Sequence, residues 1–196
     1  MSRIRVTGGS LKGRSIGIDE HGDARYTPSK VREAIFNMIG DMEGKRVLDL
    51  FAGSGSFTIE ALSRGAADAA SVERDRERWA LIRRNLEALS LLPRADVLRM
   101  DVRRAIPFLY KKGRSYDIIF MDPPYDKGYV KATMSLFGNG VLHDEDTLFV
   151  VEHSKRETID APWSGGKEHV VTKRYGDTCI SIFTLHTSNK GVTDET

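Results

Sequence analysis

Asp122, Pro123, Pro124 and Tyr125 directly follow an apolar run, residues 116–121, that is typical of a buried strand. Because proline cannot continue a sheet ladder, the strand ends here and leaves the tetrapeptide at its carboxyl edge, where open α/β sheets bind ligands. The Asp122 carboxylate and the Pro123 carbonyl can accept both N–H bonds of an exocyclic base amine, and Tyr125 can stack on the base. A strand-ending turn with a surface tyrosine is the other interpretation of the tetrapeptide alone.

A second motif joins a strand to a helix through glycines. The buried-type strand 46–51 runs into Ala52-Gly53-Ser54-Gly55-Ser56, and a helix is predicted over 57–63. Glycines at this turn let a ligand approach the backbone closely. A dinucleotide fingerprint would need glycine where Thr58 stands, which disfavours a pyrophosphate cofactor. Asp49 adds negative charge beside the loop and favours a ligand with an ammonium or sulfonium centre.

Two further carboxylates follow predicted strands. Glu73 comes after the strand 69–72 and twenty residues after Gly53, close to the offset at which an acidic residue takes ribose hydroxyls. Asp101 follows the strand 96–100 and has two interpretations: it contacts the base amine of the same ligand, or it caps the helix that begins near Val102. The basic residues of that helix form a solvated face or a second phosphate contact.

Composition limits the class of protein. The chain has 196 residues and is predicted to be one main domain with an ordinary soluble composition. We expect no membrane span, no metal site and a cytoplasmic monomer. The single cysteine, Cys179, lies in an alternating apolar stretch and is predicted to be a core residue.

The net charge of +2 is unevenly distributed. The first 32 residues carry seven basic and three acidic side chains, which suggests contact with a polyanion, although a solvated surface explains any one of them. A small hairpin over 3–18 is predicted to carry basic side chains. Thr27 is predicted to N-cap a helix whose polar residues, Arg32 among them, are explained by exposure to solvent.

The order of elements predicts an α/β fold: a Rossmann-like, doubly wound, mostly parallel sheet with a C-terminal antiparallel hairpin. A small N-terminal hairpin and helix extension precedes it. The expected division is residues 1–42 for the basic extension, 43–187 for the sheet domain and 188–196 for a polar tail.

With both motifs in place, the chain resembles the class I S-adenosylmethionine-dependent methyltransferases. More narrowly, it resembles a bacterial family that methylates the exocyclic N2 of a guanine in small-subunit (16S) ribosomal RNA. The narrower resemblance rests on the segments Arg5 to Gly9, Lys12 to Arg14, Arg25, Thr27 and Val31 to Asn37. The chain departs from the family at Tyr26, where proline is usual.

The resemblance implies roles for individual residues. The cofactor S-adenosylmethionine would be bound by Asp49, Phe51, Gly53, Ser54, Gly55, Glu73 and Asp101. Asp122, Pro123 and Tyr125 would be catalytic. The nucleic-acid contacts would be Arg5, Lys12, Arg14, Arg25 and Arg32. The partner would be small-subunit ribosomal RNA or the assembled small subunit.

Two other functions stay open from the sequence. One is methylation of adenine N6 or cytosine N4 in DNA, although the chain has no obvious additional domain to read a DNA sequence. The other is a non-catalytic RNA-binding assembly factor that keeps the fold. Intact acidic and glycine positions in both motifs weigh against the second.

Overall fold

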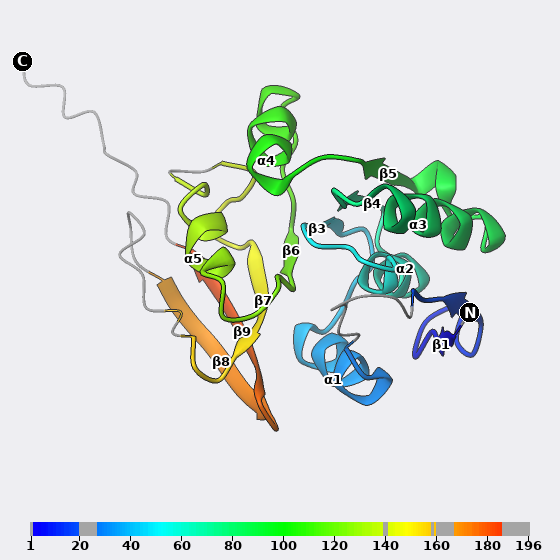
Figure 1. The fold of residues 1–196 in the computed structure, drawn as a ribbon, viewed down its shortest axis with the longest axis horizontal. Helices are drawn as coiled ribbons and strands as arrows, with labels where there is room; N and C mark the ends of the chain where they lie inside the picture. The colour runs from blue at the N-terminus through cyan, green and yellow to red at the C-terminus, as the bar shows by residue number, and fades with distance from the viewer. Residues whose placement is uncertain (1, 20–26, 139–140, 158, 160–166, 186–196) are drawn as a thin grey trace, which may run out of the picture.

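The computed structural model describes residues 2–19, 27–138, 141–157, 159 and 167–185. Its centre is a seven-stranded sheet in the order β5-β4-β3-β6-β7-β9-β8 (Figure 1). The strands are β3 (Arg46–Asp49), β4 (Asp68–Val72), β5 (Ala95–Leu98), β6 (Ile118–Met121), β7 (Leu148–Ser154), β8 (Lys167–Tyr175) and β9 (Thr178–Leu185). The mostly parallel, doubly wound sheet predicted from the sequence is therefore confirmed.

Helices cover both faces of this sheet because β3 and β6 are apolar on both sides. Along β3, Val47 packs with one group of helices and Leu48 with the other. The first group is α1 (Ser29–Ile39), α2 (Ser56–Ser63) and α3 (Arg76–Ala88), and the second is α4 (Val102–Lys111) and α5 (Tyr129–Met134). A short 3₁₀ helix, Leu92–Arg94, precedes β5.

The parallel part of the sheet aligns its strand ends in register. Asp49 of β3 lies opposite Ser71 of β4 and Phe120 of β6. The segments that leave these strands therefore start from one edge, which is where the sequence placed both motifs.

The last strands form the expected antiparallel hairpin, but the later strand is the inner one. β9 inserts between β7 and β8 and pairs antiparallel with both. This order places the apolar run of β9 in the interior, and Cys179 is buried there as predicted. The register shifts between His169 and Val171, a bulge in the outer strand β8.

The N-terminal hairpin, β1 (Arg3–Arg5) and β2 (Ser15–Gly17), is docked on the end of α2. The N–H of Ser10 donates to the Ser63 carbonyl at 2.7 Å, and the Ser63 hydroxyl donates to the Gly8 carbonyl at 2.6 Å. Gly9 has φ 74°, and a Cβ there would lie 1.9 Å from the Ser63 oxygen. Only glycine allows this approach.

A buried ion pair holds α1 and the hairpin to α2, and it overturns the expectation that Arg32 is exposed. The Arg32 side chain is 1% exposed, and its Nε lies 3.3 Å from Glu60 Oε2. The Arg32 guanidinium also donates to the Arg5 carbonyl, and Glu60 accepts from the Thr7 hydroxyl at 2.6 Å and from Arg64 Nε at 2.9 Å. Arg32 therefore faces a buried carboxylate on α2 instead of solvent.

We expect Arg32→Ala to lower the free energy of unfolding by about 3 kcal/mol, because the buried Glu60 carboxylate would lose one of its partners. Urea denaturation of the variant and wild type measures this. The matched control is Arg103→Ala, which removes an arginine from an exposed ion pair and should leave the free energy of unfolding close to that of wild type. Equal losses in the two variants would contradict the structural role given to Arg32.

Candidate functional site

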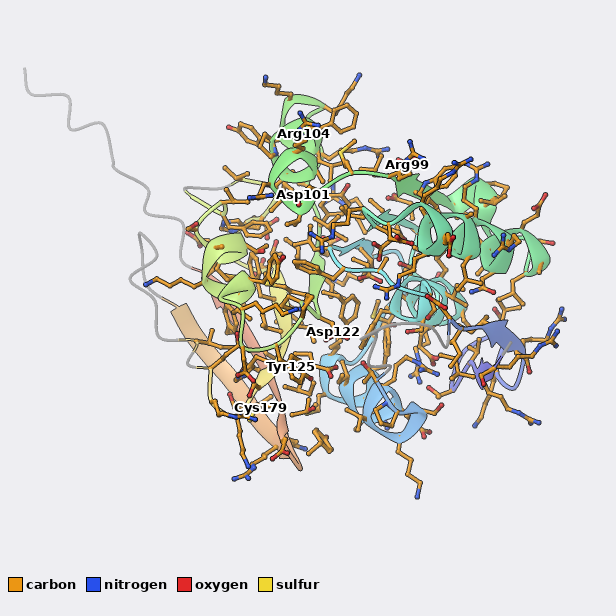
Figure 2. All side chains as sticks on the ribbon, viewed as in Figure 1. Arg99, Asp101, Arg104, Asp122, Tyr125 and Cys179 are labelled. Atoms are coloured by element: carbon orange, nitrogen blue, oxygen red, sulfur yellow. The ribbon has the colours of Figure 1, made fainter. Side chains whose placement is uncertain are left out.

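A cavity of about 530 Å³ opens at the carboxyl ends of β3, β4 and β6. Most residues that the sequence proposed for cofactor binding and catalysis line it: Phe51, Gly53, Ser54, Glu73, Asp101, Asp122, Pro123 and Tyr125. Figure 2 labels three of these residues, Asp101, Asp122 and Tyr125. The two motifs, about 70 residues apart, therefore form one site.

The loop after β3 needs glycine at two positions. Gly53 and Gly55 have φ 54° and 78°, in the left-handed region that other residues rarely adopt. Gly55 also lies close to α3, since a Cβ there would be 3.1 Å from Ile82 Cγ2. Gly55 does not line the cavity, and it is the N-cap residue of α2.

Glu73 holds this loop in place. Its Oε2 accepts from the Gly53 N–H at 3.1 Å, and its Oε1 accepts from the Asp75 N–H at 2.9 Å. The carboxylate is mostly buried in the cavity wall. Since each carboxylate oxygen has a second lone pair, Glu73 can also accept from hydroxyls of a ligand.

Asp49 lies beneath the loop and outside the cavity lining. It is 2% exposed and accepts from the Thr58 hydroxyl at 3.2 Å, and that hydroxyl is 2.7 Å from Ser71 Oγ. Burial raises the pKa of Asp49 to about 7. Thr58 occupies the position where a dinucleotide fingerprint would have glycine, and its hydroxyl links Asp49 to Ser71 under the loop.

Of the two interpretations of Asp101, the structure confirms the helix cap, while contact with the base amine of a ligand stays a prediction. Its side chain caps α4 by accepting from the Arg103 N–H at 3.0 Å, and it also lines the cavity. A hydrogen bond from the Arg103 side chain lowers the pKa of Asp101 and keeps it ionised.

Tyr125 and Thr27 are both fixed by Glu152, in the C-terminal half of β7. The Tyr125 hydroxyl donates to Glu152 Oε1 at 2.6 Å, and the Thr27 hydroxyl donates to Oε2 at 2.8 Å. Thr27 Oγ1 also lies 3.5 Å from Asp122 Oδ2. Burial and the Glu152 charge raise the pKa of Tyr125, so its hydroxyl remains a donor. Glu152 therefore holds the hydroxyl end of the Tyr125 ring, which was expected to stack on a base.

Glu152 was not predicted from the sequence, and Thr27 was misassigned. The N-cap of α1 is Pro28, whose ring cannot make a side-chain hydrogen bond, and the Thr27 hydroxyl donates to Glu152 instead. A signal for Glu152 was present: a charged residue near the end of an apolar strand, at the same sheet edge as Asp122.

The proposed nucleic-acid contacts do not form a single group. Arg5, Lys12 and Arg14 are exposed on the hairpin, whereas Arg32 is buried against Glu60. Arg25 lies outside the described residues. Of the contacts that the structure describes, only those on the hairpin can therefore meet a polyanion as predicted.

The cavity suits a nucleoside ligand that carries charges of both signs. Its wall contains the carboxylates of Glu73, Asp101 and Asp122 and the cations of Arg74, Arg78 and Lys127. In addition, Ser54 Oγ is buried in the loop without a hydrogen-bond partner among the described residues, so a ligand group can satisfy it. Both observations fit S-adenosylmethionine, which has ribose hydroxyls, an ammonium and a sulfonium.

A family model described as "Conserved hypothetical protein 95" matches residues 4–184. The chain belongs to this family. The Escherichia coli (strain K12) protein named "Ribosomal RNA small subunit methyltransferase D" is 36% identical over 172 residues, which are 86% of this chain and 85% of that protein. The Bacillus subtilis protein named "Putative rRNA methyltransferase YlbH" is 39% identical over 92% of this chain and 98% of its own length.

The fold of this family is seen in the solved structure of Escherichia coli yhhF. It aligns with a TM-score of 0.79 at 30% identity and covers 95% of this chain and 99% of that one. The resemblance to class I S-adenosylmethionine-dependent methyltransferases is thus confirmed at the level of family and fold.

Two other kinds of feature are absent from the described ranges. No helix there has the length and apolarity to cross a membrane. No group of three or more histidine, cysteine or acidic side chains there is placed to hold a metal ion.

The raised pKa of Asp49 predicts that the free energy of unfolding depends on pH. Since its folded pKa of about 7 exceeds the ordinary value of 3.8, the folded state keeps a proton that the unfolded state releases. Wild-type stability should fall between pH 4 and 7 relative to Asp49→Asn, by at most about 4 kcal/mol. Urea denaturation at pH 4.5 and 8 tests this, and a difference between the two proteins that does not change with pH would contradict it.

Proposed function

We propose that this protein transfers a methyl group from S-adenosylmethionine to the exocyclic N2 of a guanine in small-subunit ribosomal RNA. The observation that carries the proposal is the shared cavity, because the glycine loop with Glu73 and the segment from Asp122 to Tyr125 open into it together. The name of the Escherichia coli relative supports ribosomal RNA as the substrate class.

The residues at the β3 and β4 ends would hold the cofactor. The Glu73 carboxylate would accept hydrogen bonds from the ribose hydroxyls of the cofactor, and the Asp101 carboxylate would accept from its base amine. The Ser54 hydroxyl would bond to another polar group of the cofactor. Asp49 would support the loop from below, through the hydrogen bond that it accepts from Thr58. When bound, S-adenosylmethionine supplies a methyl group on a sulfonium that is already activated.

Asp122 and Pro123 would orient the acceptor amine. Its lone pair is delocalised into the guanine ring, and two acceptors on its N–H bonds turn that lone pair toward the methyl group. As the methyl group passes from sulfur to N2, Asp122 would hold the proton that N2 loses. Positioning is the largest expected contribution, up to about 7–11 kcal/mol for well-oriented reactants.

The target base must leave its stack to reach this cavity, as enzymes acting on bases require. Tyr125 would stack on the extruded base while Glu152 fixes its hydroxyl. The exposed cations of the hairpin, Arg5, Lys12 and Arg14, would contact phosphates of the surrounding RNA.

Identification of the product tests the proposal against its alternatives. The protein is incubated with labelled S-adenosylmethionine and, separately, unmodified small subunits, free 16S RNA and duplex DNA, and the methylated nucleoside is identified by mass spectrometry. N2-methylguanosine from subunits or RNA is expected. N6-methyladenine or N4-methylcytosine from DNA would favour the DNA alternative, and cofactor binding without transfer to any of them would favour an assembly factor.

We expect Asp122→Ala to lower kcat roughly 10- to 100-fold, since a hydrogen bond to a charged group is worth about 1.5–3 kcal/mol. The Kd for S-adenosylmethionine, measured by calorimetry, should stay near the wild-type value. Asp146→Ala, which removes an exposed carboxylate elsewhere, should change neither quantity. Loss of cofactor affinity in Asp122→Ala would show that its assigned role is wrong.

Gly55→Val should give the opposite pattern. Valine is strained at φ 78° and its Cβ would press on Ile82, so the loop must move. We expect cofactor affinity to fall first, by roughly tenfold or more, because the loop that contacts the cofactor would be displaced. Calorimetry checks this, and unchanged affinity would contradict the role of the loop.

A further inference from the structure

The solvent-facing side of α4 combines exposed aromatic rings with cations. Among the described residues, the exposed large apolar side chains are Phe108 and Tyr110, 40% and 54% exposed, and both belong to α4. Arg104 and Lys111 are exposed on the same helix, and Lys112 is exposed at its C-cap. The buried side of α4 is made by other residues, Val102, Ala105, Ile106 and Leu109, so the rings are not needed for the core.

The spacing places most of these side chains in one stripe. Phe108, Lys111 and Lys112 follow Arg104 by four, seven and eight residues, and such positions lie above one another on a helix. Lys112 Nζ lies 5.8 Å from the centre of the Phe108 ring, which confirms that the two share a surface. Tyr110, two residues after Phe108, is exposed on another side of the same helix. We call these five residues the α4 stripe.

Other cations of this region are engaged by carboxylates. Arg103 pairs with Asp101 at 2.8 Å and Arg114 with Asp96 at 2.5 Å. The structure shows no ion pair for Arg104, Lys111 or Lys112 among the described residues. The stripe therefore presents positive charge that is not neutralised within this part of the chain.

The N-terminal end of α4 lies at the cavity. Asp101 and Val102, the first residues of this segment, line the cavity, and Arg104 lies in the first turn of α4 that follows. Figure 2 shows Arg104 beside Asp101, on the side of the molecule away from Tyr125. The ten residues of α4 extend about 15 Å from this point.

We propose that the α4 stripe is a second RNA-binding surface, which holds the single-stranded segment next to the target nucleotide. This inference rests on the proposed function and extends it beyond the N-terminal hairpin. Cations on a helix face contact phosphates, and aromatic faces beside them stack on bases that are already unstacked. A polyanion fits the uncompensated charge better than an apolar protein surface would.

Two multiple variants separate the parts of this surface. Arg104→Ala/Lys111→Ala/Lys112→Ala removes the cations, and Phe108→Ala/Tyr110→Ala removes the rings. Lys45→Ala/Lys131→Ala/Lys173→Ala is the matched control, because it removes three exposed lysines from other parts of the chain. Thermal melting and the Kd for S-adenosylmethionine establish that each variant is folded with an intact cofactor site.

Binding of free 16S RNA and of small subunits is measured by filter binding from about 0.1 to 0.3 M salt, where phosphate contacts set the salt dependence. The cation variant should raise Kd at least roughly tenfold and reduce the slope of log K against log salt by about 2, since each single-strand phosphate contact contributes about 0.7. The ring variant should raise Kd about tenfold with an unchanged slope. Both should raise the KM for RNA and leave kcat at saturating RNA near that of wild type.

If the cation and ring variants bind RNA with the same affinity as the lysine control, the inference is wrong. The proposed function would still hold in that case, provided that the wild-type protein transfers methyl groups to RNA. Weaker binding to subunits with unchanged binding to free RNA would also overturn the inference, because the partner would then be a ribosomal protein. Absence of transfer and of RNA binding by wild type would instead reject the proposed function itself.

Discussion

The parallel register of β4, β3 and β6 is the constraint on which the site depends. It brings the glycine loop, Glu73 and the segment from Asp122 to Tyr125 to one edge, although they are far apart in the chain. These strands are buried on both faces, so a slip of the register would disturb two cores at once. The relative positions of the segments that line the cavity are therefore fixed by the same packing that stabilises the sheet.

The basic hairpin is joined to the loop after β3 through buried polar contacts. Glu60 of α2 holds Thr7 and Arg32, and α2 begins directly after Gly55. On the other side, the Asn85 side-chain amide donates to the carbonyls of Gly17 and Ser54, both at 2.9 Å. These contacts give the hairpin a fixed orientation with respect to the cavity, which an RNA-binding arm requires if the target base is to enter.

Local patterns predicted the elements and most of the cavity wall, because a strand followed by glycines or prolines is a short-range signal. Glu152 and the buried pair of Arg32 with Glu60 were not predicted. Their positions depend on contacts between residues 27 or more apart in the chain, and a polar residue on a helix looks the same in sequence whether it faces water or a buried carboxylate. Thr27 was misassigned for the same reason.

The loop after β3 and the Asp122 segment share one cavity, and we propose that this cavity binds the methyl donor. A crystal structure with S-adenosylhomocysteine bound tests this most directly. We expect the ribose hydroxyls within hydrogen-bond distance of Glu73, the base near Asp101, and the sulfur facing the open space beside Asp122. Density for the ligand at another surface, with this cavity empty, would contradict it.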